Sequence, residues 1–526
     1  MTPNFTLHEK AAQLVFVRFG SNMRPAVKAE EDLERVAALL EAYPLGGIVL
    51  FNGRWPETPA VLAELQSRSP YPLLVGMDME RGVGQQIKGA TVFPHALAFS
   101  ALGDDAPVQL EAAARVQARE ALASGVHITF SPVADVNRNP RNPIISTRAF
   151  GTEPEGAAQL VEAYIRGCQA EGLLTTAKHF PGHGNTTGDS HAELPIVHDS
   201  REELDTYDLV PFKAAIEAGV ELVMTAHVAF DALDPTHTPA TASKPILTDL
   251  LRDELGFTGT VITDSLLMGG IKETHATPGE QAAGLVAAGV DILLDVEDPA
   301  AAIDGMVAAV EAGTLTEARL DEAVQRVWAL KQHFVERFGE GFFTDPQDAL
   351  SIHDVAQPDD EALAQQIAAQ SITTYGDSSV LLPLTLDDAA ASDLLVLTIR
   401  TQRSRLDPAV QPIGQLVQEH WPQADYVEID ETTDAATFEQ LLALAKTKAH
   451  VIACVVVKPA AWHHYGLQTD QAEFVDALVR QQNVILAAMG SPFVLDDFPR
   501  AAARLCTYSD VAVSQHALAE RLGLKP

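Results

Sequence analysis

The chain has few cysteines for its length. There are three among 526 residues, Cys168, Cys454 and Cys506. They are widely spaced, their number is odd, and no pair has the spacing of a metal-binding motif. This pattern implies no disulfide framework and is typical of small buried thiols in a reducing compartment. Basic residues are also scarce: 36 Lys and Arg stand against 72 Asp and Glu, and the formal net charge is -36. Such a charge disfavours nucleic acids and anionic membranes as partners.

Long apolar segments are missing as well. The segment from Met1 to Lys10 has neither the basic start nor the apolar core of a signal peptide, and no later stretch is long and apolar enough to cross a bilayer. We therefore expect a cytoplasmic protein with no membrane partner. The chain is nevertheless 47% hydrophobic, which is enough for a large core, and its length indicates more than one domain.

Short apolar runs alternate with amphipathic segments over residues 1–340. This alternation predicts the α/β class, with an N-terminal (β/α)8 TIM-type barrel as catalytic domain. The eight predicted strands are Leu14–Phe19, Gly47–Phe51, Leu73–Asp78, His127–Val133, Leu173–His179, Leu222–His227, Val261–Asp264 and Asp291–Leu294. Helices are predicted over Ala106–Ser124, Pro154–Glu171 and Glu202–Ala218. Ionisable side chains stand where the third to eighth strands end, the face on which barrel enzymes build their sites. They are Asp78, Asp135, Lys178 with His179, His227, Asp264 and Asp295.

A second domain is predicted after a boundary rich in glycine and proline, Gly339–Pro346. We expect a linker over residues 341–377 and a smaller C-terminal α/β sandwich over 378–526, with a doubly wound, mostly parallel sheet. Its predicted strands are Val380–Leu382, Leu394–Ile399, Tyr426–Ile429, Val451–Val457, Val484–Met489 and Leu505–Tyr508.

The most informative segment is Lys178–His191, which follows an apolar run. It gathers Lys178, His179, His183, Asp189 and His191 in a glycine-rich stretch. A buried strand that ends in cations, imidazoles and a carboxylate indicates a catalytic site. An imidazole titrates near neutral pH and can both give and take a proton, and a carboxylate two residues away can orient it.

The segment Gly172–His191 resembles the signature of family 3 glycoside hydrolases of the β-N-acetylglucosaminidase, or β-hexosaminidase, type. Further blocks agree with this family in the same order, which is more specific than a single motif. They are Phe130–Asn137, Asn142–Gly151, Val223–His227 and Gly256–Met268. The resemblance implies a retaining double displacement, in which a carboxylate forms a covalent glycosyl-enzyme that water then hydrolyses.

The resemblance also assigns roles to residues. It makes Asp264 the nucleophile, His191 the general acid and base, and Asp189 the partner of His191. It implies substrate contacts from Asp78, Arg148, Lys178 and His179, with supporting positions for Asp135 and His227. Lys178 and Arg148 would supply a positive field that keeps the nucleophile ionised. No metal and no organic cofactor is expected. The expected substrate is a small carbohydrate with a terminal β-linked N-acetylglucosamine, such as a peptidoglycan or chitin fragment.

One block departs from the family. After the third strand the family pattern is Asp-x-Glu-Gly-Gly-Arg-Val-x-Arg, whereas this chain reads Asp78-Met-Glu-Arg-Gly-Val-Gly-Gln-Gln86. Both arginines are absent from their usual positions, and Arg81 and Lys88 are the candidate replacements. The departure leaves the contacts on the far side of the sugar open.

Several alternatives stay open from the sequence. They are a family 3 β-glucosidase, a glycoside phosphorylase, a metal-dependent hydrolase and a sugar-binding protein without catalysis. A metal site would draw on His179, His183, Asp189, His191 and Asp264. The C-terminal loop Lys458–Gly466 carries adjacent aromatic and imidazole side chains, and we favour interdomain packing over a wall of the sugar site. The oligomeric state is not predicted.

Overall fold

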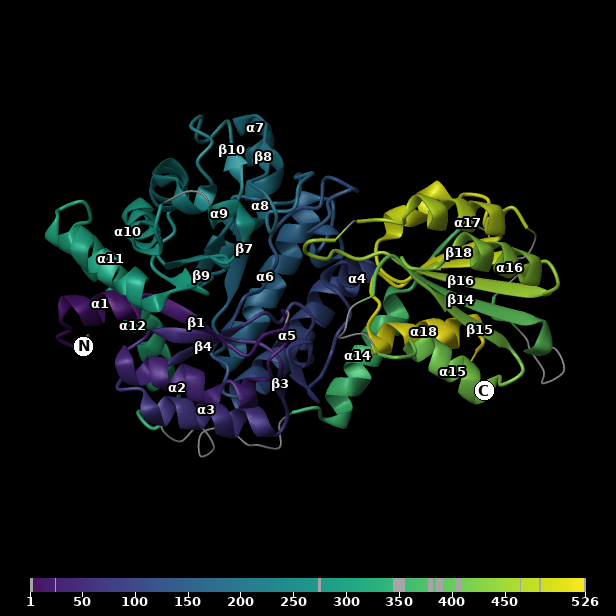
Figure 1. Cartoon of the computed structure of the whole chain (residues 1–526), viewed down its shortest axis with the longest axis horizontal. Coiled ribbons are helices and arrows are strands. Elements are labelled where there is room, and N and C mark those ends of the chain that lie inside the picture. The colour runs from purple at the N-terminus through teal and green to yellow at the C-terminus, as the bar shows by residue number, and fades with distance from the viewer. Residues whose placement is uncertain are drawn as a thin grey trace. The chain divides into compact units, whose positions relative to one another are not determined.

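The computed structural model describes residues 3–23, 25–272, 276–343, 355–376, 382–384, 391–403, 408–463, 465–481 and 484–524. The chain divides into two compact units (Figure 1). Unit 1 comprises Met1–Val92, Pro107–Arg138 and Ala149–Glu361. Unit 2 comprises Phe93–Ala106, Asn139–Arg148 and Ala362–Pro526.

Unit 1 contains two parallel sheets, with strand orders β12-β1-β2-β4-β6 and β11-β9-β7. Their bounds are β1 (Val15–Phe19), β2 (Gly47–Leu50), β4 (Leu74–Met77), β6 (Ile128–Thr129), β7 (Thr176–Phe180), β9 (Leu222–Thr225), β11 (Thr260–Thr263) and β12 (Leu293–Leu294). Parallel bridges Ile128–Leu174 and Ile262–Ile292 join the edges of the two sheets. Two further parallel pairs are β3 (Gly53–Arg54) with β5 (Ile87–Lys88) and β8 (Ile196–Val197) with β10 (Ala229–Phe230). Each of the eight predicted runs overlaps a strand, and the α/β class is confirmed.

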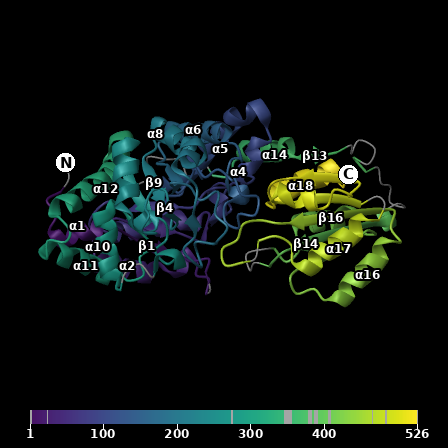
Figure 2. The same ribbon diagram turned by 90° about the horizontal axis from the view of Figure 1, so that it is seen from above.

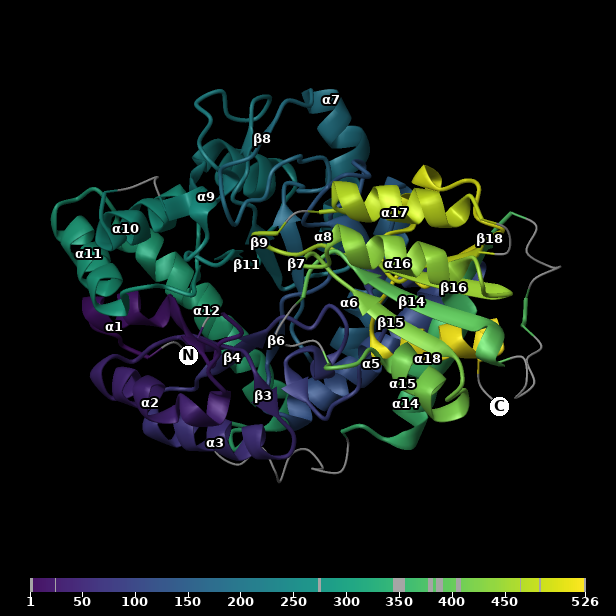
Figure 3. The same ribbon diagram turned by 45° about the vertical axis from the view of Figure 1, so that its right-hand side comes forward.

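Helices surround the strands of unit 1 in Figure 3. They are α1 (Leu7–Gln13), α2 (Leu33–Ala42), α3 (Glu57–Arg68), α5 (Ala106–Ala123), α6 (Pro154–Glu171), α7 (Arg201–Glu203), α8 (Leu209–Glu217), α9 (Gly269–Lys272), α10 (Pro278–Ala288), α11 (Pro299–Glu311) and α12 (Glu317–Phe338). Local sequence sets where they begin: Thr6 and Glu9 form a capping box at α1, and Pro154 opens α6. The predicted helix Glu202–Ala218 is wrong as a single α-helix, because a π-helical segment, Leu204–Asp208, separates α7 from α8. The spacing of apolar residues in the sequence does not reveal a local change from α-helical to π-helical hydrogen bonding.

Asp291, two residues before β12, is fully buried and binds three arginines. It accepts hydrogen bonds from Arg252 Nη2 (2.7 Å), Arg319 Nη2 (2.7 Å) and Arg326 Nη1 (3.1 Å). We expect Asp291→Ala to lower the free energy of unfolding by about 2 kcal/mol, because the guanidinium groups would lose their counter-ion. The arginine side chains keep 14 to 26% exposure, so the loss stays below that for a fully buried pair. Urea denaturation beside the exposed control Asp249→Ala measures it, and equal stabilities would contradict the expectation.

Unit 2 is built on a six-stranded sheet of order β13-β18-β17-β16-β14-β15. The strands are β13 (Thr373–Tyr375), β14 (Leu394–Arg400), β15 (Asp425–Ile429), β16 (His450–Val456), β17 (Val484–Ala488) and β18 (Ala503–Cys506). β13 is antiparallel to β18, and the other neighbours are parallel. Figure 2 shows α16 (Ala435–Ala445) and α17 (Thr469–Val479) on one face and α18 (Ala512–Leu522) on the other. Helix α15 (Pro412–His420) shares an apolar cluster with α18.

The structure differs from the sequence prediction around the linker. The expected linker 341–377 contains α14 (Pro358–Ser371) and β13. Helix α14 is rich in Ala and Gln, so its apolar period is weak, and β13 is three residues long. The predicted strand Val380–Leu382 falls mainly on residues 380–381, outside the described residues. Two segments of the first 340 residues belong to unit 2, where Leu97 and Ala98 of α4 (Ala96–Ser100) join the core.

Candidate active site

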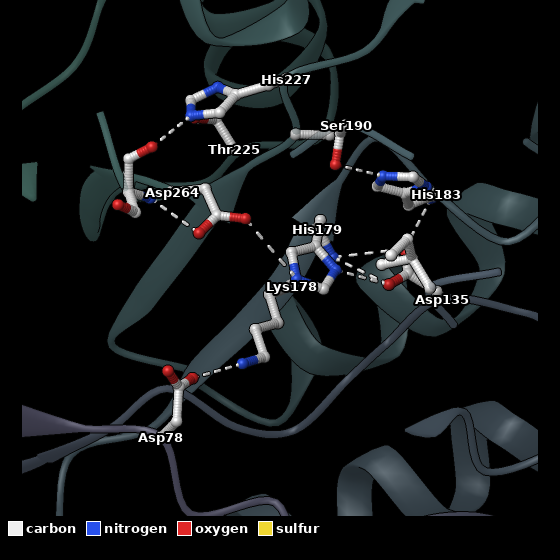
Figure 4. A network of polar contacts seen from close by, with 12 residues as sticks. Asp78, Asp135, Lys178, His179, His183, Ser190, Thr225, His227 and Asp264 are labelled. Atoms are coloured by element: carbon white, nitrogen blue, oxygen red, sulfur yellow. Dashed lines mark hydrogen bonds and ion pairs between the residues drawn. The ribbon is translucent and has the colours of Figure 1, made fainter. Parts of the chain in front are cut away.

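Asp264 follows β11 and stands at the centre of a polar network (Figure 4). Its Oδ1 accepts a hydrogen bond from the Ser265 backbone N–H at 2.7 Å, and its Oδ2 lies 3.8 Å from His179 Nε2. The side chain keeps 23% exposure, so an incoming molecule can reach it. Burial by itself would raise the pKa of Asp264, but electrostatic interactions with neighbouring groups, His179 first among them, hold it at about 2. Asp264 is therefore a carboxylate at neutral pH.

A bulge in β7 turns two consecutive side chains toward this network. The register of β7 against β9 pairs Ala177 with Val223 and Phe180 with Thr225, so β7 holds one extra residue between the two pairs. In a regular strand, neighbouring side chains point to opposite faces, and a bulge changes this alternation. Figure 4 shows Lys178 extending toward Asp78 while His179 lies between Asp135 and Asp264.

Lys178 is buried and binds two carboxylates. Its Nζ lies 2.7 Å from Asp78 Oδ1 and 2.7 Å from Glu80 Oε1. Asp78 keeps 31% side-chain exposure, whereas Glu80 keeps 10%. The lysine therefore orients Asp78, whose carboxylate can also accept hydrogen bonds from a ligand. Sequence reasoning did not single out Glu80, although it stands two residues after Asp78.

His179 and the loop after β7 are both held by Asp135. The carboxylate binds His179 Nδ1 at 2.7 Å and accepts the backbone N–H of His183 at 2.6 Å. The two ring nitrogens of His183 contact Thr186 Oγ1 at 2.7 Å and Ser190 Oγ at 2.9 Å. Asp135 is fully buried, so its role is to support these groups. His183 extends the support to the segment that carries Asp189 and His191.

Asp189 and His191 form a paired unit. Asp189 Oδ1 lies 2.8 Å from His191 Nδ1 and accepts the His191 backbone N–H at 2.9 Å. Because a carboxylate only accepts, Nδ1 donates the proton and Nε2 is the nitrogen suited to proton exchange with a ligand. The His191 ring keeps 23% side-chain exposure. It also contributes to the low pKa of Asp264, which places both groups in one electrostatic environment.

Ser265 ties the neighbourhood of Asp264 to two more strand ends. Its hydroxyl donates to Asp295 Oδ2 at 2.6 Å, and its carbonyl accepts from His227 Nε2 at 3.1 Å. Asp295 in turn binds Arg18 of β1. Burial lowers the pKa of His227. Arg18 and Ser265 were missed from the sequence, although Arg18 lies within the first predicted strand.

Three further predicted features have the following contacts. Arg148 belongs to unit 2, where its Nη1 donates to the carbonyl of Ile144 at 3.0 Å, and its substrate contact stays a prediction. The Arg81 backbone N–H binds Gln85 Oε1 at 3.0 Å, and Lys88 is exposed on β5. In the loop Lys458–Gly466, Tyr465 lies 2.6 Å from Ser146 Oγ within unit 2.

A metal centre is not formed by the residues that the structure describes. Among them, no group of three or more His, Cys, Asp or Glu side chains is arranged to hold an ion. His183 directs its ring nitrogens at hydroxyl groups, and Asp135 is engaged by His179 and His183. None of the described helices is long and apolar enough to span a membrane.

Comparison with known proteins agrees with the family resemblance found in the sequence. The chain matches the glycosyl hydrolase family 3 N-terminal domain over residues 6–330. It is 35% identical over 364 residues to a β-N-acetylglucosaminidase/β-glucosidase from Cellulomonas fimi, in a match covering 67% of this chain and 63% of the relative. A glycoside hydrolase family 3 β-N-acetylglucosaminidase from Paenibacillus sp. str. FPU-7 has a similar structure, with a TM-score of 0.81 at 31% identity, covering 99% of this chain and 97% of that chain. A β-glucoside phosphorylase shares the fold, with a TM-score of 0.84 at 23% identity over 99% of this chain and 92% of that chain.

The chain therefore belongs to glycosyl hydrolase family 3. In the match with the Cellulomonas fimi protein it spans less than two thirds of that relative's length.

Proposed function

We propose that this chain is a retaining exo-β-N-acetylhexosaminidase that releases terminal β-linked N-acetylglucosamine. One observation carries the proposal: the same environment holds an ionised carboxylate, Asp264, and a separate His191–Asp189 pair suited to proton transfer. Double displacement needs these two functions on different groups. The relative and the solved structure that bear the β-N-acetylglucosaminidase name favour the N-acetyl sugar.

The chemistry assigns one task to each group. Asp264 attacks the anomeric carbon and forms the glycosyl ester, while His191 Nε2 protonates the leaving oxygen. In the second step His191 takes a proton from water, the water oxygen attacks the anomeric carbon, and the ester bond to Asp264 breaks. Asp189 holds the ring orientation and stabilises the imidazolium that forms after the water is deprotonated. His191 thus alternates between acid and base.

Sugar binding is proposed for Asp78, Lys178, His179 and Arg148. Asp78 is oriented by Lys178 and partly exposed, which suits a carboxylate that accepts hydrogen bonds from sugar hydroxyls.

We further propose that the two sheets of unit 1 close into one (β/α)8 barrel, because single bridges join both pairs of sheet edges. The site would then lie at the C-terminal mouth. Peptidoglycan and chitin fragments are the proposed natural substrates.

We expect His191→Ala to separate substrates by their leaving groups. N,N′-diacetylchitobiose needs a protonated leaving oxygen, so its kcat/KM should fall about 100-fold or more. 4-Nitrophenyl N-acetyl-β-D-glucosaminide has a good leaving group, and its kcat/KM should fall much less. Added azide should accelerate turnover of the aryl substrate by the variant, because an anion attacks the ester without a general base. Equal losses on both substrates would contradict the assignment of His191.

Glucoside hydrolysis is the second candidate, because the name of the Cellulomonas fimi relative joins both activities. The wild type is assayed on the aryl glucoside and the aryl N-acetylglucosaminide, with and without phosphate. A higher kcat/KM on the glucoside would replace the proposed function. Glycosyl phosphate among the products would indicate a phosphorylase, and loss of activity with a chelator would indicate a metal-dependent hydrolase. Absence of turnover on every substrate would support a binding protein.

A further inference from the structure

The segment after Asp264 is hydrogen-bonded to the segment that carries His191. The chain turns from β11 through Ser265–Met268 into the short helix α9. The backbone N–H of Gly269 donates to the carbonyl of His191 at 2.9 Å, and that of Gly270 donates to the carbonyl of Ser190 at 3.1 Å. Two consecutive donors after Asp264 therefore meet two consecutive acceptors, Ser190 and His191.

Both positions are crowded because the two segments approach each other closely. A Cβ atom on Gly269 would lie 2.8 Å from the carbonyl oxygens of His191 and Ala192. A Cβ atom on Gly270 would lie 3.0 to 3.2 Å from the carbonyl oxygens of Ser190, Glu193 and His227. At the distances found for Gly269 a neighbouring atom must shift, whereas at those found for Gly270 the neighbours must give by a few tenths of an ångström. Neither glycine has a positive φ, so the backbone conformation itself is open to other residues.

Ser190 is held from two sides. Its carbonyl accepts from Gly270, and its hydroxyl contacts His183 Nε2 at 2.9 Å. His183 is anchored in turn by its backbone N–H on the buried carboxylate of Asp135. The segment between Phe180 and His191 contains three glycines, which by themselves allow many backbone conformations. These contacts select one of them.

We propose that Gly269 and Gly270 are positioning residues that set His191 relative to Asp264. This inference rests on the proposed function. A general acid must stand within hydrogen-bond reach of the leaving oxygen while the nucleophile faces the anomeric carbon, and small displacements are costly. The two glycines couple these groups through backbone contacts that a methyl side chain would push apart. Their backbone N–H groups bind the segment that carries His191, so they act through His191.

The test compares Gly269→Ala and Gly270→Ala with Gly156→Ala. Gly156 lies in α6 and lacks a positive φ, and a Cβ atom added there would have no neighbouring atom within 4 Å, so it controls for the added methyl group. We expect Gly269→Ala to lower kcat/KM on diacetylchitobiose at least tenfold and on the aryl N-acetylglucosaminide markedly less, with unchanged thermal melting. Gly270→Ala should shift both values in the same direction, and Gly156→Ala should match the wild type.

Hydrogen–deuterium exchange gives a readout that does not depend on activity. Peptides covering residues 186–195 should exchange at least threefold faster in Gly269→Ala than in the wild type and in Gly156→Ala. The proposal would be overturned if Gly269→Ala and Gly270→Ala both exchanged at the wild-type rate. Equal losses of kcat/KM on the two substrates would overturn it as well. If the wild type hydrolyses neither substrate, the proposed function fails, and the exchange rates still decide whether the glycines hold this segment.

Discussion

Replacing Asp264 with asparagine is expected to reduce hydrolysis of 4-nitrophenyl N-acetyl-β-D-glucosaminide by roughly a thousandfold or more, the scale seen when a nucleophile is removed. The amide keeps the shape of the side chain but cannot form the glycosyl ester. The pKa of Asp264 is about 2, so the wild-type carboxylate stays ionised throughout the neutral range. If activity falls as the pH is lowered toward 4, protonation of Asp264 is therefore not the cause. Initial rates of both proteins at matched concentration measure the effect.

Two controls make this result specific. Asp249→Asn changes an exposed carboxylate of the same unit and should retain wild-type rates. A slow 5-fluoro-N-acetylglucosaminyl substrate should add one sugar to the wild type, and the label should appear on the peptide that contains Asp264. A label on another residue, or a variant that keeps a tenth of the wild-type rate, would refute the nucleophile assignment.

Stability is expected to depend on pH through Lys331, which lies in α12 and is fully buried. Its Nζ donates to Gln13 Oε1 at 2.6 Å and lies 5.5 Å from the centroid of the Trp328 ring. Burial lowers the pKa of Lys331 to about 7. Above pH 7 the folded state therefore holds a neutral amine, whereas the unfolded chain keeps it protonated up to the ordinary lysine pKa of 10.5. The unfolded state binds more protons in this window, so stability rises with pH.

We expect the free energy of unfolding of the wild type, relative to Lys331→Met, to rise by about 3 kcal/mol between pH 7 and pH 9.5, at about 1.4 kcal/mol for each pH unit. Below pH 7 the amine is protonated in both states and the difference should level off at its lowest value. Urea denaturation at several pH values measures it. Lys244→Met, which removes an exposed lysine, should show no such slope. A pH-independent difference for Lys331→Met would show that the buried amine does not titrate in this window.

Much of unit 1 follows from local pattern. Each predicted run overlaps a strand because its apolar residues must be buried on both faces of a parallel sheet. The polar residue that ends such a run then falls at the same edge as its neighbours, which is why Asp78, Lys178, His179 and Asp264 could be named in advance. Helix α6 coincides with its predicted range, since Pro154 and Gly172 mark its ends.

Other features depend on contacts between distant parts of the chain. Glu80 and Arg18 look like ordinary charged residues until the fold brings them to Lys178 and Asp295. The β7 bulge is a mismatch with β9, so β7 alone does not disclose it. Segments Phe93–Ala106 and Asn139–Arg148 join unit 2 through packing that no periodicity records.

The sequence by itself determined the α/β class, most strand positions, the family and the residues proposed for catalysis. They can be predicted because the spacing of apolar residues and the catalytic motifs both depend on residues that are close together in the sequence. Tertiary structure alone decided which groups lower the pKa of Asp264, the buried position of Lys331 and the close approach of other backbone atoms at Gly269 and Gly270. Each of these depends on burial, charge or close approach among groups distant in sequence, and such interactions exist only once the chain has folded.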